Sequence, residues 1–261
     1  MPPPVGFRTV LLPASREQIN KLGKRLASGG GVSDDDLRAL EELTVSHLTA
    51  LELARPRVNG LAVDTGTAPL HITHRAKTTQ TIIEKLRREQ GMALARVQDL
   101  AGIRIVGAMR FDEQDMLAEE IARRFPADPR EARTVNRRAN PSHGYQAVHV
   151  IVSLDGITIE VQVRTLLQHV WADLMERLAD RLGRQIRYGA PPVPPPGMNL
   201  DTAQTIVKGM MDISEDWAAL GGQTAADPLV SASAEPLHVE QITEEIWRRV
   251  AGALRKSGID L

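Results

Sequence analysis

The sequence predicts an α+β fold in which a mixed β-sheet is flanked by helices, with extra helices at both ends of the chain. Apolar or alternating segments typical of strands occur between residues 70 and 164, and segments with helical periodicity separate them. Purely helical patterns precede and follow this region, and 261 residues suffice for one such domain. We expect a helical segment over 1–60, a core over 61–190, and a proline-rich linker with C-terminal helices over 191–261.

The amino-terminal segment contains two predicted helices. Residues 16–26 have a helical pattern that stops at a run of glycines. Ser33 then supplies an N-cap, and the three aspartates after it suit a first helical turn because the helix dipole favours negative charge there. Leucines continue at helical spacing, and Pro56 is expected to end this second helix.

The remaining elements follow from changes in periodicity. Strands are expected over 70–74, 103–106, 145–154 and 157–164, and helices over 80–90, 111–125, 166–182, 201–220 and 239–256. Asp155 and Gly156 join the last two strands and are a strong hairpin signal.

Composition excludes several classes of protein. The 32 basic and 33 acidic residues leave a net charge of −1, which argues against coating of nucleic acid through overall charge but allows a local basic pocket. The absence of cysteine excludes disulfides, thiolate metal sites and cysteine nucleophiles. No apolar run has the length of a signal peptide or a membrane span, so we expect a cytoplasmic protein with no membrane partner.

The predicted strand over 157–164 has a polar face of unusual chemistry. Side chains alternate along a strand, so Glu160 and Gln162 point away from the face of Ile and Val residues. A hairpin partner would place Tyr145 and His149 on the same face. A ring, an imidazole, a carboxylate and an amide on one surface suit a nucleotide better than bulk water, although a solvated strand face is the alternative.

A second group of residues is basic. Arg75 and Lys77 lie at the end of a strand that is followed at once by a helix. At about 100° per residue, Lys85 and Arg88 share one face of that helix. Phosphates suit such an arrangement of a helix N-terminus and point charges. The alternative is an ordinary amphipathic helix whose basic face is solvated.

Two further residues lie just before the next strand and inside it. Asp99 directly precedes it, where a carboxylate can hold Mg²⁺ that bridges substrate phosphates, and a simple turn residue is the alternative. Arg104 lies inside the apolar run Ile-x-Ile-Val, so its side chain must snorkel, pair or face a ligand cleft.

These segments, in this order, resemble the RelA/SpoT synthetase family, whose stand-alone members are small alarmone synthetases. The resemblance covers about residues 74–188 and rests on Arg75-x-Lys77 with Ile82-Ile83-x-Lys85, Asp99-x-x-Gly102-x-Arg104, Gly144-Tyr145-x-x-x-His149, and Glu160-x-Gln162-x-Arg164-Thr165 with Trp171-Ala172. It implies a nucleotidyltransferase-like fold. It also implies transfer of pyrophosphate from ATP to the 3′-hydroxyl of GDP or GTP, which makes the alarmone (p)ppGpp with AMP as by-product.

The resemblance implies roles on the donor side of the site. Arg75 and Arg104 would stack on either side of the ATP adenine. Lys77, Lys85 and Arg88 would hold the ATP phosphates.

It also implies roles at the metal and on the acceptor side. Asp99 and Glu160 would bind Mg²⁺, and Glu160 would assist deprotonation of the acceptor hydroxyl. The residues expected on the acceptor side are Tyr145, which would stack on guanine, and His149, Gln162 and His169.

Two positions depart from the family pattern, both on the acceptor side. Pro141 stands where members commonly have lysine, and Arg137 and Arg138 in the same loop are candidates to replace it. His169 stands where stand-alone members often have asparagine. The chain has no His-Asp dipeptide, so the hydrolase half of long members is not expected.

Two other functions remain open. The first is a toxic relative that transfers pyrophosphate to the 3′ end of tRNA, or to an adenosine nucleotide, with Arg133, Arg137 and Arg138 available to contact RNA. The second is a nucleotide-binding protein that has lost turnover, against which the presence of both Asp99 and Glu160 argues. Homo-oligomerisation through the terminal helices is an additional possibility.

Overall fold

A computed structural model describes residues 10–64, 70–125, 133–221 and 239–256 of the chain. The amino-terminal residues 1–9, where no signal peptide is expected, lie outside these ranges. In chain order the elements are α1 (Arg16–Ala27), α2 (Asp34–Asp64), β1 (His71–Ala76), α3 (Thr79–Arg88), η1 (Leu94–Arg96), β2 (Ala101–Gly107), α4 (Phe111–Arg124), β3 (Arg133–Asn136), β4 (Val148–Leu154), β5 (Ile157–Thr165), α5 (Leu166–Leu182), η2 (Arg184–Tyr188), α6 (Leu200–Ala219) and α8 (Val239–Lys256).

The strands form one five-stranded sheet in the order β1-β2-β5-β4-β3. β2 and β5 are parallel and the other neighbouring pairs are antiparallel, so the predicted mixed sheet is confirmed. The predicted hairpin is also present, because β4 and β5 meet at Asp155 and Gly156, whose φ angles are 52° and 79°. The register places His149 opposite Gln162, and Gly102 opposite Glu160.

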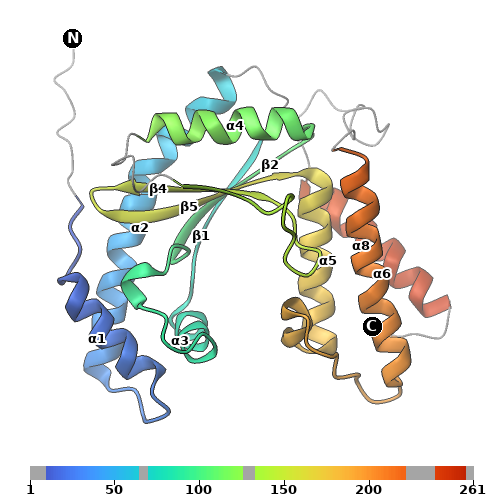
Figure 1. Ribbon diagram of the computed structural model, residues 1–261, viewed down its shortest axis with the longest axis horizontal. Helices are drawn as coiled ribbons and strands as arrows, with labels where there is room; N and C mark the ends of the chain where they lie inside the picture. Colours follow the sequence, from blue (N-terminus) through green and yellow to red (C-terminus); the bar gives the residue numbers. More distant parts are fainter. Residues whose placement is uncertain (1–9, 65–69, 126–132, 222–238, 257–261) are drawn as a thin grey trace.

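The two faces of the sheet have different partners. The face of alternating Ile and Val residues packs against α2 and α4 in one continuous core. Ile105, Val161 and Val163 of this face have at most 1% of their surface exposed. The opposite face carries Arg104, Glu160 and Gln162 and lies between α3 and α5 (Figure 1). The polar side chains of the two central strands, β2 and β5, thus face an open space with a helix on each side.

Helix α2 does not end at Pro56, as the sequence predicted, but continues through it to Asp64. Leu51, Ala54, Val58 and Leu61 recur at helical spacing on both sides of the proline, and at most 2% of each is exposed. Pro56 itself is exposed, so its ring points to solvent. Burial of the apolar face therefore outweighs the hydrogen bond that the proline removes.

The strands differ from the prediction in two places near one edge of the sheet, the start of β4 and the presence of β3. β4 begins at Val148 rather than at residue 145, because the preceding turn has positive φ angles at His143 (51°) and Gly144 (79°). β3 was not predicted. It is a four-residue, mostly exposed edge strand with no alternation of apolar residues, so it carries no pattern from which to predict it.

Helices α6 and α8 pack against α5 and form a second core. This core contains Trp171 of α5, Met210 of α6 and Val239 of α8. The Trp171 indole Nε1 donates to the Met210 carbonyl at 2.6 Å. The helices that follow the proline-rich stretch are therefore joined to the sheet through α5.

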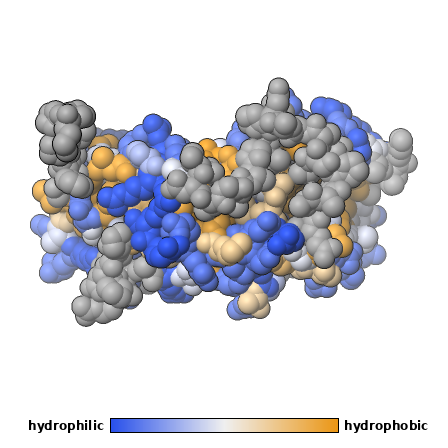
Figure 2. All heavy atoms as spheres, turned by 90° about the horizontal axis from the view of Figure 1, so that it is seen from above, coloured by the Kyte–Doolittle hydropathy of each residue, from blue (hydrophilic) through white to orange (hydrophobic). Residues whose placement is uncertain are grey.

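The side of the molecule that carries α4 is shown in Figure 2. Over its described atoms, hydrophilic residues are interspersed with apolar ones. Among the described residues, no helix has both the length and the apolar character needed to cross a membrane.

Candidate functional site

A cavity of about 930 Å³ lies over the open face of the sheet, with walls from α3, α5 and η2. Ten of its lining residues are Lys or Arg and six are Asp or Glu, whereas the whole chain has a net charge of −1. The excess of positive charge is therefore concentrated in this cavity, which favours anionic ligands. Every site residue expected from the sequence lines it except His169.

On one side of the cavity, Asp99 lies between two lysines. Its carboxylate is 2.9 Å from the Lys85 ammonium and 3.3 Å from that of Lys77. Lys77 is held there by the hydrogen bond from its backbone N–H to the Leu100 carbonyl at 2.9 Å. Thr78 caps α3 by accepting from the Thr81 N–H, which sets the direction of the helix that carries Lys85. The side chains of both lysines are less than 20% exposed.

On the other side, five residues form a closed ring of hydrogen bonds. The five members are Tyr145, His149, Glu160, Gln162 and Arg164. The distances are 2.9 Å from Tyr145 Oη to His149 Nε2, 2.9 Å from His149 Nδ1 to Glu160, and 2.7 Å from Gln162 Nε2 to Glu160. Arg164 Nη2 closes the ring by donating to Gln162 Oε1 at 2.9 Å and to Tyr145 Oη at 3.0 Å. Every donor in the ring meets an acceptor when His149 Nδ1 carries a proton and Nε2 accepts a hydrogen bond from the Tyr145 hydroxyl.

The ring determines the charge of Glu160. Burial raises the pKa of Glu160, but the hydrogen bonds from His149 and Gln162 and the charges of His149 and Lys85 lower it overall to about 2. Glu160 is therefore an anion at neutral pH. Lys85 pairs with Asp99, and its positive charge also acts on Glu160.

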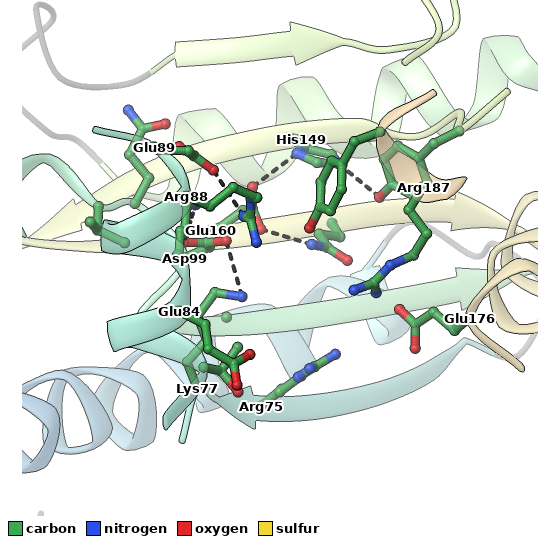
Figure 3. Close-up of a pocket in the computed structure, with 18 of the residues that line it drawn as sticks. Arg75, Lys77, Glu84, Arg88, Glu89, Asp99, His149, Glu160, Glu176 and Arg187 are labelled. Carbon is green, nitrogen blue, oxygen red and sulfur yellow. Dashed lines mark hydrogen bonds and ion pairs between the residues drawn. The ribbon is translucent and has the colours of Figure 1, made fainter. Parts of the chain in front are cut away.

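Apart from Arg88 and Arg184, the arginines of the cavity form no ion pair with the acidic residues that the structure describes. Burial, with the nearby charge of Arg164, lowers the pKa of Arg104, while Glu176 acts in the opposite direction. The Nε groups of Arg104 and Arg164 are buried and have no hydrogen-bond partner. Figure 3 shows Arg75 and Lys77 on one side of the pocket and Glu176 and Arg187 on the other.

His169 is the one expected site residue that the structure places elsewhere. It lies on α5 with 9% of its surface exposed and does not line the cavity. Burial, together with the charges of Arg164, Arg104 and His71, lowers the pKa of His169 to about 3. The imidazole is therefore neutral at physiological pH and lies near these arginines, outside the cavity lining.

Sequence reasoning missed several residues of the cavity. Arg164 shares the two-residue period of Glu160 and Gln162, so its position on the polar face was expected but its hydrogen-bonding role was not. Glu176 lies on α5 and Tyr188 on η2, and no local pattern places either of them opposite α3.

The donor set around Lys85 suits a magnesium ion. Asp99 and Glu160 supply carboxylate oxygens, which Mg²⁺ prefers together with water and phosphate oxygens. No cluster of three or more His, Cys, Asp or Glu side chains able to hold a metal exists in the described part of the chain. A bound cation would therefore need oxygens from substrate and water to complete its coordination.

Comparison with known proteins identifies the family. Residues 74–179 match the family model described as "Region found in RelA / SpoT proteins". The uncharacterized protein Rv1366 of Mycobacterium tuberculosis is 35% identical over 207 residues, which are 79% of this chain and 74% of that protein. The uncharacterized protein Mb1401 of Mycobacterium bovis matches to the same extent. The chain belongs to the RelA/SpoT family.

Solved structures show that this RelA/SpoT protein has the synthetase fold. The small alarmone synthetase 1 from Bacillus subtilis aligns with a TM-score of 0.52 at 21% identity, covering 71% of this chain and 94% of that one. A GTP pyrophosphokinase family protein from Streptococcus pneumoniae aligns with a TM-score of 0.50 at 19% identity, covering 72% and 98%. The expected fold class is thereby confirmed.

The family pattern makes the loop before Tyr145 informative. Pro141, which stands where family members commonly have lysine, is exposed and does not line the cavity. Arg138 pairs with Asp115, donates to the Phe111 carbonyl at 3.1 Å and stacks on the Phe111 ring, so it is held on α4. Of the two arginines considered as replacements, only Arg137 lines the cavity.

Proposed function

We propose that this RelA/SpoT protein transfers pyrophosphate from ATP to the 3′-hydroxyl of GDP or GTP, producing (p)ppGpp and AMP. The observation that carries the proposal is that two carboxylates, Asp99 paired with Lys85 and the anionic Glu160, line a cavity that is otherwise strongly cationic. Phosphoryl-type transfer depends mainly on positioning and on neutralising phosphate charge, and these residues supply both kinds of group.

On the donor side, cationic residues would bind ATP. Arg75 and Arg104 line the cavity and form no ion pair with a described residue, so their guanidinium faces are available to stack on adenine. Lys77, Lys85 and Arg88 would contact the phosphates. ATP would replace part of the lysine contact with Asp99, because phosphate oxygens compete for the same ammonium groups.

In the transfer step, the acceptor 3′-oxygen attacks the β-phosphorus of ATP. A bond forms between these atoms, the bond from the β-phosphorus to the α,β-bridging oxygen breaks, and AMP leaves. Glu160 would accept a hydrogen bond from the 3′-hydroxyl as its proton departs. With a pKa of about 2 it is a weak base, so its negative charge beside the reacting atoms is its larger contribution. Mg²⁺ held by Asp99 and Glu160 would neutralise charge on the transferred phosphates.

On the acceptor side, the hydrogen-bonded ring would orient the nucleotide. The Tyr145 hydroxyl is held by His149 and Arg164, which fixes the aromatic face against which guanine would stack. Arg137 is the available cation for acceptor phosphates on this side.

The test separates the labelled products formed from ATP that carries the label at the γ-phosphate. GDP, GTP, GMP, unlabelled ATP and tRNA are offered in separate reactions with Mg²⁺. We expect labelled product with GDP and GTP, together with stoichiometric AMP. Label in tRNA alone, or in the adenosine nucleotide alone, would replace the proposed acceptor and leave the donor assignment intact.

A variant at Glu160 tests the catalytic assignment. Glu160→Gln keeps the size of the side chain but removes its charge and replaces one acceptor oxygen by an NH2 donor. We expect transfer to fall by at least about a hundredfold while ATP binding is retained. Unchanged transfer would refute the role of Glu160. Val193→Ala, an exposed change outside the cavity, serves as the control.

A further inference from the structure

Two contacts cross the cavity between α3 and η2, which are far apart in the sequence. Arg184 Nη1 lies 3.6 Å from Glu84 Oε2. The Arg88 guanidinium carbon lies 4.5 Å from the centre of the Tyr188 ring. Glu84 and Arg88 are one helical turn apart on α3, and all four residues line the cavity.

Tyr188 has the environment of a ligand-site residue rather than of a core residue. Its surface is 46% exposed. Its ring contacts cations, because the guanidinium carbon of Arg187 also lies within 5.8 Å of the ring centre. A half-exposed ring between two guanidinium groups adds little to the hydrophobic core, so its position requires another explanation.

The segment that carries Tyr188 is firmly anchored. Ile186 is 1% exposed, and Val193 N–H donates to the Leu182 carbonyl at 2.7 Å. Gly189 has a φ of 77°, and a Cβ there would lie 2.4 Å from the His143 ring. The turn after Tyr188 is therefore packed against the loop that leads to Tyr145.

Arg88 has a second partner, which it contacts at the same time as Tyr188. Its side chain is 42% exposed, and its Nη2 lies 3.0 Å from the carboxylate of neighbouring Glu89. Pairing with Glu89 uses guanidinium N–H groups. Stacking on Tyr188 does not, because the ring contacts the flat face and leaves the N–H groups at the edge free to donate.

We propose that Tyr188 is a positioning residue that holds Arg88 for the phosphates of the donor nucleotide. The inference rests on the proposed function only in that it assigns Arg88 to those phosphates. The Tyr188 ring is held in place by the anchored η2 segment, and the Arg88 side chain extends from α3 across the cavity to contact it. The ring holds the flat face of the guanidinium over the site while Glu89 binds part of its edge, and the remaining N–H groups stay free to donate.

The test measures ATP binding by calorimetry in the presence of Mg²⁺. Tyr188→Phe keeps the ring and should bind ATP as the wild type does. Tyr188→Leu and Tyr188→Gln lack the ring and should raise Kd for ATP roughly five- to tenfold. In transfer assays the same two variants should raise KM for ATP and leave KM for the acceptor unchanged. Thermal unfolding of each variant shows whether it is folded.

A double-mutant cycle separates positioning from an independent contact. If Tyr188 acts through Arg88, the double variant Arg88→Ala/Tyr188→Leu should bind ATP no more weakly than Arg88→Ala alone. Val193→Ala, at a residue 65% exposed on the same side of α5, is the control and should match the wild type.

Three outcomes would overturn the inference: wild-type affinity in Tyr188→Leu and Tyr188→Gln, a loss in Tyr188→Phe equal to theirs, or independent losses in the double variant. Binding of ATP without any transfer would refute the proposed function alone, because the calorimetric comparison still decides the role of Tyr188. A wild-type protein that binds no ATP would refute both.

Discussion

Arg164 and His169 are two buried polar residues next to each other at the site, of which Arg164 lines the cavity and His169 does not. Arg164 is 4% exposed and uses one nitrogen to hold both Tyr145 and Gln162. His169 packs near it as a neutral ring, because a second positive charge beside Arg164 and Arg104 would be unfavourable. Histidine at this position therefore fills space beneath a positively charged cluster without adding to its charge.

The depressed pKa of His169 predicts a pH dependence of stability. Between its ordinary value of 6.5 and its folded value of about 3, the unfolded chain binds a proton that the folded chain does not. The free energy of unfolding should therefore fall as the pH drops below about 6.5, by about 1.4 kcal/mol per pH unit from this residue. His169→Asn should lose this contribution.

Urea denaturation at pH 7, 6 and 5 measures how steeply the free energy of unfolding changes with pH in the wild type and in His169→Asn. Glu160 does not interfere, because its stabilising contribution is complete above about pH 4.5 and is lost only as the pH falls toward 2. Other histidines contribute equally to both proteins. The prediction would be contradicted if the free energy of unfolding changed with pH equally in the wild type and in His169→Asn.

Helix α6 fixes the loop that carries Tyr145. The Gln146 side chain donates to the Ser214 carbonyl and hydroxyl, each at 3.1 Å. At Gly144, a Cβ would lie 2.7 Å from the Trp171 ring and 2.9 Å from the Met211 sulfur. An element that follows the proline-rich stretch thus holds in place the loop of Tyr145, which we propose stacks on the acceptor base.

This packing predicts the effect of adding one methyl group. Gly144→Ala should lower the free energy of unfolding by about 2–4 kcal/mol, because it combines a φ of 79° with overpacking against α5 and α6. It should also raise KM for the acceptor more than KM for ATP. Urea denaturation and steady-state kinetics measure these effects.

Gly209 in α6 provides the matched control. A Cβ there meets nothing within 4 Å, so Gly209→Ala should stabilise the protein by about 0.5–1 kcal/mol through better helix propensity. Equal effects of the two changes would show that the loop is not packed as described.

At the scale of the whole molecule, charge is separated between the cavity and the remaining surface. Ten basic and six acidic residues line the cavity of a chain whose net charge is −1. Overall charge therefore gives no long-range attraction for polyanions, whereas the local field of the cavity attracts small anions.

This separation predicts how nucleotide binding depends on salt. Raising KCl from about 0.05 M to 0.5 M should weaken ATP binding by about tenfold, since the Debye length falls from roughly 14 Å to roughly 4 Å. Adenosine has no phosphates and should bind with nearly constant affinity over the same range. Calorimetric titrations with both ligands measure the contrast, and equal salt dependence would contradict it.

Local periodicity in the sequence was enough to predict four of the five strands and to predict which candidate site residues share a face of a strand or helix. The alternation over 157–164 placed Glu160, Gln162 and Arg164 on one face, and the hairpin at Asp155 and Gly156 brought His149 opposite them, because strand geometry leaves only two faces. The amphipathic pattern of α3 likewise placed Lys85 and Arg88 on one surface.

Only the tertiary structure decided the features that depend on distant partners. Helix α2 passes through Pro56 because a buried face continues on both sides of it. His169 is buried on α5, and Arg138 is held on α4 by Asp115 and Phe111, so neither lines the cavity. The contact of Arg88 with Tyr188 joins α3 and η2. Local sequence specifies the faces of an element, whereas the packing of elements specifies which faces meet.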